Sequence, residues 1–323
     1  MDRQKRSTVF GAALILFALA LRLMLWQGAQ AVRLPEETTC GNLLRPSANL
    51  QLPEQTLPPV DTTAPVEPDY RQFVAEDLTK AGVQYAQDCP YRPDLQELLL
   101  QKLSWDLSGD EPTVLILHTH ASESYTRQPG ETYVETADYR TLDENYNMIA
   151  VGDRLAELLV TAGISVIHDR QIHDYPSYSD SYANSRAAAR QYLQQYPSIC
   201  LVLDLHRDAA ENPDGTQYAT SVDIEGEQGT QIMLVVGTDA SGNEHPHWQQ
   251  NLALALKLQV ILEEFAPGIT RRSILRAQRF NQDLCTGALI VEVGTAGNTL
   301  EEAMRSVPVL AKAIVELIHG ANL

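Results

Sequence analysis

The segment HTHASE carries two imidazoles and a carboxylate, the side-chain types that bind catalytic zinc. His118, His120 and Glu123 follow the apolar run VLIL, which suits a strand buried on both faces. Strands of α/β sheets deliver functional groups at their C-terminal ends. Histidines at i and i+2 point to the same side if the strand continues. Ordinary hydrogen-bonded histidines would give the same pattern, so the segment alone suggests only half of a metal site.

Two later segments carry polar residues where a buried strand would normally have aliphatic ones. LVLDLHRD contributes Asp204, His206, Arg207 and Asp208, and ALIVEVG contributes Glu292. A carboxylate in such a strand is costly to bury unless it is paired or bound to a metal. Because parallel strands end at one rim of a sheet, these residues can meet the HTHASE segment in space.

A mononuclear catalytic zinc needs three His or carboxylate ligands and an open position for water. The metal lowers the pKa of that water, and a carboxylate outside the ligand set accepts and returns the proton. We expect His206 to be one imidazole ligand, together with His118, His120 or both. Glu123 is the nearest carboxylate ligand. Glu292 is the expected general base, with a structural partnership to a buried arginine as its alternative.

Other polar residues are weaker candidates for the site. Arg207 and Asp208 would orient ligands or substrate, or else pair with each other or cap a helix. Glu144 is a rival candidate for the carboxylate ligand. Its alternative is a structural role in the first turn of a helix, where the helix dipole favours a negative charge. The HPHW segment puts His245 near a helix start, where it could line a substrate groove or pack on the core. His168 is assigned no role.

The elements that would position these residues alternate between strands and helices. We predict strands over residues 114–117, 164–167, 201–205, 231–236 and 288–293, and helices over residues 145–162, 181–195, 248–265 and 300–319, the last interrupted near Pro308. Gly163 is well placed to end the first helix. This alternation predicts an α/β fold, with a mostly parallel twisted sheet flanked by helices.

The N-terminal part has the pattern of a membrane anchor followed by a stalk. Residues 1–8 are basic, and residues 9–26 form an apolar run of about 18 residues, roughly 27 Å as a helix. We predict a cytoplasmic N-terminus and a single transmembrane helix, with a cleaved signal peptide ending near the AQA of residues 29–31 as the alternative. Proline-rich residues 27–69 predict a flexible stalk. Residues 70–110 would be an N-terminal extension of an extracytoplasmic catalytic domain at residues 111–323.

Charge and cysteine content exclude two classes of protein. The net charge of −18 argues against a nucleic-acid partner, because phosphate binding needs a basic surface. The four cysteines form no C-x-x-C pair, which excludes a cysteine-rich zinc module and a disulfide scaffold.

Motifs from residue 114 to the C-terminus resemble, in order, those of the stage II sporulation protein P family. They are HTHASESY, DLHRDA, VVGTD, HPHW and GALIVEVGTAGNTLEEA. The resemblance implies a zinc amidase-like fold and a membrane-anchored peptidoglycan hydrolase. Such an enzyme is an N-acetylmuramoyl-L-alanine amidase, also an endopeptidase on cross-linked stem peptides, that acts in engulfment during endospore formation. It also implies cooperation with stage II sporulation proteins D and M.

The resemblance implies part of the ligand set. In the wider group of zinc amidases the ligands are His, Glu and His, and a Glu on a late strand is the base. His206 matches the late His and Glu292 the late Glu, while the first His and the middle Glu stay open. His247 departs from the family, whose loop has Asn there. A deacetylase, a carboxypeptidase or a non-catalytic wall-binding protein of the engulfment complex are the alternatives.

Overall fold

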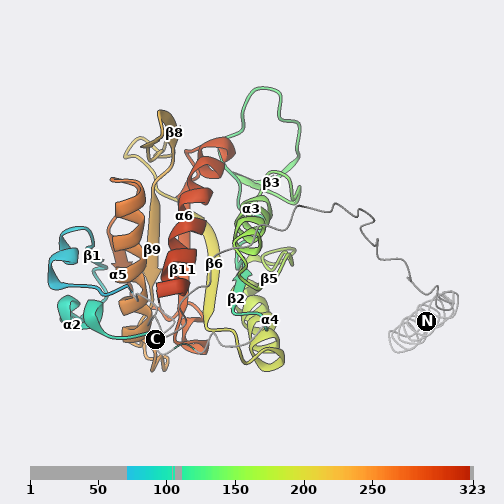
Figure 1. The fold of residues 1–323 in the computed structure, drawn as a ribbon. Helices are drawn as coiled ribbons and strands as arrows, with labels where there is room; N and C mark the ends of the chain where they lie inside the picture. Colours follow the sequence, from blue (N-terminus) through green and yellow to red (C-terminus); the bar gives the residue numbers. More distant parts are fainter. Residues whose placement is uncertain (1–70, 104, 106–110, 321–323) are drawn as a thin grey trace, which may run out of the picture. The chain divides into compact units, whose positions relative to one another are not determined.

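The computed structural model describes residues 71–103, 105 and 111–320. Their centre is a seven-stranded sheet with the strand order β1-β10-β9-β11-β6-β2-β5 (Figure 1). In that order the strands are Val83–Tyr85, Ser273–Leu275, Ile232–Val236, Ala288–Thr295, Leu201–Asp208, Val114–Leu117 and Val166–His168. Neighbouring strands are parallel except β9 and β11. The predicted mostly parallel α/β sheet is therefore confirmed.

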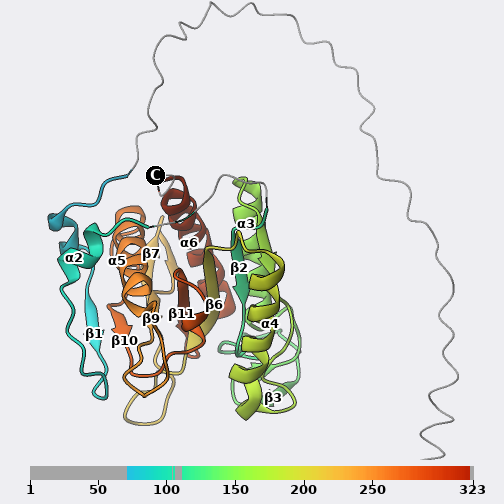
Figure 2. The ribbon, with the colours of Figure 1, turned by 90° about the horizontal axis from the view of Figure 1, so that it is seen from below.

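Helices cover both faces of the sheet. Figure 2 shows α3 (Met148–Thr161), α5 (Trp248–Phe265) and α6 (Leu300–Gly320) along one face and α4 (Ser181–Gln195) on the other. The smaller elements are η1 (Ala75–Thr79), α2 (Leu95–Leu100), η2 (Tyr178–Asp180), η3 (Gln282–Leu284) and two hairpins, β3–β4 (Glu135–Ala137 and Arg140–Thr141) and β7–β8 (Val222–Ile224 and Glu227–Gly229).

The two faces of the sheet bury different side chains. Leu203, Leu205 and Val291 belong to the large apolar core under α3, α5 and α6. Because side chains alternate along a strand, His206 and Glu292 lie on the other face, where α4 covers a smaller apolar cluster. The polar residues of β6 and β11 therefore do not interrupt the main core.

Most predicted elements are confirmed. Both α4 and α5 have the predicted bounds. α3 begins later than predicted, because Asn147 caps it by accepting a hydrogen bond from the backbone N of Ile149 at 2.9 Å. Gly163 follows α3 with a φ of 85°, the left-handed conformation expected of a residue that ends a helix.

The break predicted in the last helix is wrong. α6 runs continuously through Pro308. A proline removes one backbone donor from the helix, but Val307, Leu310 and Ile314 are fully buried along one side of α6. Packing of that side against the core keeps the helix continuous.

The sheet also contains strands that the sequence pattern did not reveal. β1 pairs with β10, and β10 pairs with β9. Since β9 is antiparallel to β11, these three strands run opposite to the other four. β1 and β10 have three residues each, too few to show a period. β1 lies in the predicted N-terminal extension, so this segment completes one edge of the sheet.

The predicted anchor at residues 9–26 and stalk at residues 27–69 lie outside the described residues. Within residues 71–320, as far as they are described, no helix is both long and apolar enough to cross a membrane.

Candidate active site

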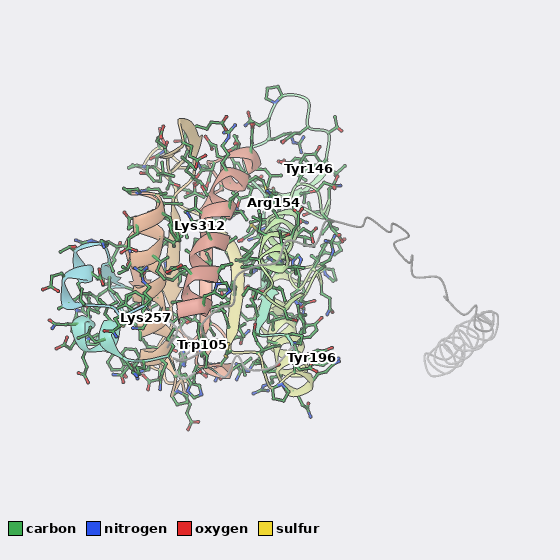
Figure 3. All side chains as sticks on the ribbon, viewed as in Figure 1. Trp105, Tyr146, Arg154, Tyr196, Lys257 and Lys312 are labelled. Atoms are coloured by element: carbon green, nitrogen blue, oxygen red, sulfur yellow. The ribbon has the colours of Figure 1, made fainter. Side chains whose placement is uncertain are left out.

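Three strand ends meet at one end of the sheet. β2, β6 and β11 are parallel, so their C-terminal ends lie together, and Glu292 is in register with His206 on the neighbouring strand. Figure 3 labels Tyr146 toward this end, and Trp105 and Tyr196 toward the other. Residues from widely separated parts of the chain are therefore brought to one place.

His206 lies between two carboxylates. Its Nδ1 is 3.4 Å from Glu123 Oε2, and its Nε2 is 2.9 Å from Asp204 Oδ1. The second contact is short but poorly directed, so Nε2 has no well-formed hydrogen bond among the described residues. Burial disfavours the charged ring, yet the carboxylates of Asp204 and Glu123 raise the pKa of His206 well above its ordinary value.

Asp204 connects His206 to the loop after β2. Its carboxylate accepts hydrogen bonds from the backbone N of Thr119 at 2.7 Å and from Thr119 Oγ1 at 2.6 Å. Burial opposes ionisation, but His206 and the Thr119 donors hold the pKa of Asp204 below its ordinary value. The ionised carboxylate thus fixes the positions of β6 and the HTHASE loop relative to each other.

Glu123 is a buried carboxylate surrounded by cations. Oε1 accepts a hydrogen bond from Arg140 at 3.2 Å and lies 3.5 Å from a guanidinium nitrogen of Arg207. Oε2 accepts from the backbone N of Arg207 at 3.3 Å. Burial would raise the pKa of Glu123, but Arg207 and His206 hold it well below its ordinary value. Glu123 is therefore ionised where it meets His206.

His120 is surrounded by aromatic rings. Tyr178 stacks on it with ring centroids 4.6 Å apart and planes at 10°, while Tyr182 and His206 approach edge-on at 5.6 and 5.3 Å. Its buried Nδ1 has no hydrogen-bond partner within the described part of the chain. Burial lowers the pKa of His120 to about 4, so the neutral ring, the form that binds metals, predominates at neutral pH.

Glu292 completes this group. Its Oε2 is buried and lacks a hydrogen-bond partner among the residues described. Burial raises the pKa of Glu292 to about 8, and the carboxylates of Glu123 and Asp208 add to the shift against the charge of His206. A carboxyl group that exchanges its proton near neutral pH is suited to general acid–base chemistry.

His118 lies apart from this group. Its Nε2 is 2.8 Å from His168 Nε2, and its Nδ1 is 3.2 Å from the carbonyl oxygen of Leu205. Burial and the neighbouring His168 lower the pKa of His118 to about 3. Gly152 of α3 makes room for both rings, since a Cβ there would come within 2.5 Å of His118 Nε2. His118 is therefore packed against α3, with both ring nitrogens engaged.

Arg207 and Asp208 do not pair with each other. Arg207 donates hydrogen bonds to the carbonyl oxygens of Ser124 and Tyr139, both at 3.0 Å, and so holds the loop that carries Glu123. Asp208 accepts from Arg271 at 2.8 Å.

Glu144 and His245 lie away from the group. Glu144 precedes α3, is exposed, and pairs with Arg170. His245 is in the loop after β9, and β9 is antiparallel to β11, so this loop leaves the sheet at the end opposite to His206. The ring of His245 is 1% exposed, and burial lowers its pKa to about 4.

Sequence reasoning missed the contacts that Arg140, Tyr178 and Tyr182 make with the site. The sequence around Arg140 and around Tyr178 is polar and without a regular pattern, and the helical pattern around Tyr182 gave no sign of a role. For Arg140, the available signal was that Glu123 would need a cation if it were buried. His168, which had no expected role, pairs with His118.

The donor types at this rim are those that zinc prefers. His120 Nδ1 and His206 Nε2 are buried ring nitrogens without a well-formed hydrogen bond in the described chain, and Glu123 is an ionised carboxylate beside them. In their present spacing, however, the described residues include no group of three His, Cys, Asp or Glu side chains arranged to hold a metal ion. The chemistry of the donors fits zinc, whereas their spacing does not yet form a complete ligand set.

A family model described as stage II sporulation protein P (SpoIIP) matches residues 59–315. Stage II sporulation protein P of Bacillus subtilis (strain 168) is 27% identical over 227 residues, covering 67% of this chain and 53% of that protein. The chain thus matches about half the length of this curated relative.

Solved structures show weaker similarity. N-acetylmuramoyl-L-alanine amidase AmiC2 of Nostoc punctiforme is 11% identical with a TM-score of 0.40, covering 65% of this chain and 98% of that chain. The CwlD amidase of Clostridioides difficile, solved in complex with the GerS lipoprotein, is 14% identical with a TM-score of 0.39, covering 64% and 98%. At these values we transfer no residue role from either structure.

Proposed function

Because this chain belongs to the stage II sporulation protein P family, we propose that it is a peptidoglycan hydrolase that acts during engulfment in endospore formation. The bond cleaved is the amide between N-acetylmuramic acid and L-alanine, with stem-peptide cross-links as a second class of substrate. Residues 9–26 would anchor the enzyme in the membrane, and stage II sporulation proteins D and M would be its partners.

The observation that carries this proposal is the environment of Glu292. A carboxyl group with a pKa of about 8, in register with a histidine that is itself flanked by carboxylates, is costly for a purely structural role. Amide hydrolysis requires a group that removes a proton from water and delivers it to the leaving amine, and the Glu292 carboxyl group is suited to this role.

His120, Glu123 and His206 would hold the zinc, and for this His206 would have to lose the proton that Asp204 and Glu123 stabilise on its ring. Zinc bound there would lower the pKa of a water molecule and polarise the amide carbonyl. Of the two imidazoles in the HTH sequence we propose His120, because both ring nitrogens of His118 already have partners. Asp204 and Arg207 are positioning residues, since they fix β6 and the HTHASE loop.

Glu292 Oε2 would take the proton from the attacking water and return it to the departing nitrogen of L-alanine. Glu123 cannot serve as this base, because Arg207 and His206 stabilise its ionised form and make it a poor proton acceptor at neutral pH. Because the pKa of Glu123 is lowered and that of Glu292 is raised, we assign the ligand role to Glu123 and the base role to Glu292.

Mass spectrometry of the products from purified peptidoglycan, with and without a chelator, tests the proposal. Free stem peptides and peptide-free glycan, formed only without chelator, are the expected result. Release of acetate with the peptides still attached would indicate a deacetylase instead. Binding to peptidoglycan without any cleavage would indicate a wall-binding protein.

A further inference from the structure

Tyr178 stacks on His120 and is itself exposed to solvent. Its ring stacks on His120 at 4.6 Å, and the guanidinium carbon of Arg140 lies 4.8 Å from the centre of the same ring. His120 is 7% exposed, whereas Tyr178 is 57% exposed. The tyrosine therefore touches two residues of the site and still has a large accessible surface for another molecule.

We propose that Tyr178 is a specificity-determining residue on which a sugar ring of the glycan strand rests, an inference that depends on the proposed function. A pyranose has an apolar face of C–H groups bordered by hydroxyl groups. A tyrosine matches it, with an apolar ring and a polar tip. The amide to be cleaved lies next to the muramic acid ring, so a side chain stacked on His120 is close to that sugar.

A cleft of about 570 Å³ adjoins the site at Arg140 and Arg207 and has a different chemistry. Polar side chains line it, among them Glu211 and Gln217, together with Tyr139. Such a surface offers hydrogen-bond donors and acceptors, which suit a peptide better than the face of a sugar. Arg140 lines this cleft and also contacts Tyr178. This arrangement directs the stem peptide into the cleft and leaves the sugar to Tyr178.

Competitive inhibition by the two halves of the substrate tests this inference. The purified full-length enzyme is assayed on a disaccharide–tetrapeptide, with the peptide-free disaccharide or the free tetrapeptide as inhibitor. Tyr178→Ala is expected to raise KM and the Ki of the disaccharide about 3- to 10-fold and to leave kcat and the Ki of the tetrapeptide unchanged. Tyr178→Trp should restore the wild-type values.

Tyr175 provides a matched control. It lies three residues before Tyr178, in the segment that leads into η2, and is similarly exposed, at 54%. Tyr175→Ala should change neither inhibition constant, which would show that the effect belongs to the ring on His120 and not to an exposed tyrosine in general.

Three results would overturn the inference. If Tyr178→Ala lowers kcat and leaves the disaccharide Ki unchanged, Tyr178 only supports His120. If both inhibition constants rise together, the ring has no preference for the sugar. If the disaccharide fails to inhibit the active wild-type enzyme, no sugar subsite exists. A wild-type enzyme that cleaves no peptidoglycan would instead contradict the proposed function.

Discussion

His118 and His120 are two residues apart but lie in opposite environments. His118 packs against α3, where His168 and the carbonyl oxygen of Leu205 engage both ring nitrogens. His120 faces α4, where aromatic rings surround it and its buried Nδ1 lacks a hydrogen-bond partner in the described chain. β2 ends at Leu117 and a turn follows, so the rule that i and i+2 share a side does not apply here.

We infer that the contrast separates a structural cluster from a reactive one. Buried polar atoms in native proteins normally have hydrogen-bond partners, and exceptions need an explanation. Such exceptions occur at several places in the described chain, both ring nitrogens of His245 among them, but those of His120, His206 and Glu292 lie at the same rim of the sheet, while the His118 side is satisfied. We therefore expect substitutions on the His118 side to lower stability and substitutions on the other side to lower activity.

The largest expected effect is on catalysis. Glu292→Gln should lower kcat for peptidoglycan cleavage by about 10²- to 10⁴-fold, because the amide cannot accept a proton. Turnover on purified peptidoglycan measures the loss, and circular dichroism checks the fold. Glu144→Gln, at the exposed rival carboxylate, serves as the control and should have wild-type activity. Full activity in Glu292→Gln would remove this residue from the mechanism.

The next prediction compares the stability of variants at the two histidines. His118→Ala should lower the free energy of unfolding by about 2–4 kcal/mol, since it leaves a cavity and removes partners from His168 and the Leu205 carbonyl. His120→Ala should cost less, because no hydrogen bond at Nδ1 is lost. Urea denaturation of both variants in chelator, which removes any stabilisation by bound zinc, measures the difference, and equal losses would contradict the contrast.

Gly152→Ala should reverse the usual effect of this substitution in a helix. Alanine in place of glycine normally stabilises a helix interior by about 0.5–1 kcal/mol. Here the new Cβ would press on the rings of His118 and His168, so we expect a destabilisation of about 1–3 kcal/mol. Thermal unfolding shows the sign of the stability change. A stabilised variant would mean that the rings of His118 and His168 are less tightly packed against α3 than the structure shows.

The smallest effect is a dependence of stability on pH. The pKa of Glu292 is raised to about 8 in the folded protein, so burying this carboxyl group costs no stability below its ordinary pKa, and the cost grows as pH rises to about 8 and is constant above it. The stability gain of Glu292→Gln over the wild type should therefore grow by roughly 1–3 kcal/mol between about pH 4.5 and pH 8 and then stay constant. Urea titrations in chelator test this, and a difference that does not change with pH would contradict the raised pKa.

Much of the fold could be predicted from the sequence. α3 has apolar residues at helical spacing, α4 and α5 are long runs rich in residues that favour helices, and β2, β6 and β11 are buried apolar runs. The sequence did not reveal that β9 runs antiparallel to β11. This direction depends on pairing with β1 and β10, two strands too short to show a pattern.

Site residues could be predicted only where a strand fixes the direction of the side chain. Asp204, His206 and Glu292 follow from strand alternation and from the register between β6 and β11. His118, His120 and Tyr178 do not, because turns and loops set the directions of their side chains. Arg140 reaches Glu123 from a hairpin that the sequence suggested only as a polar loop.

The most direct test is the zinc content of three purified proteins: wild type, His118→Ala and His120→Ala, each measured after dialysis against metal-free buffer. We expect about one zinc per chain in the wild type and in His118→Ala, and a marked loss in His120→Ala. Loss of zinc from His118→Ala alone, or a wild type that retains none, would contradict the assignment of His120 to the reactive cluster.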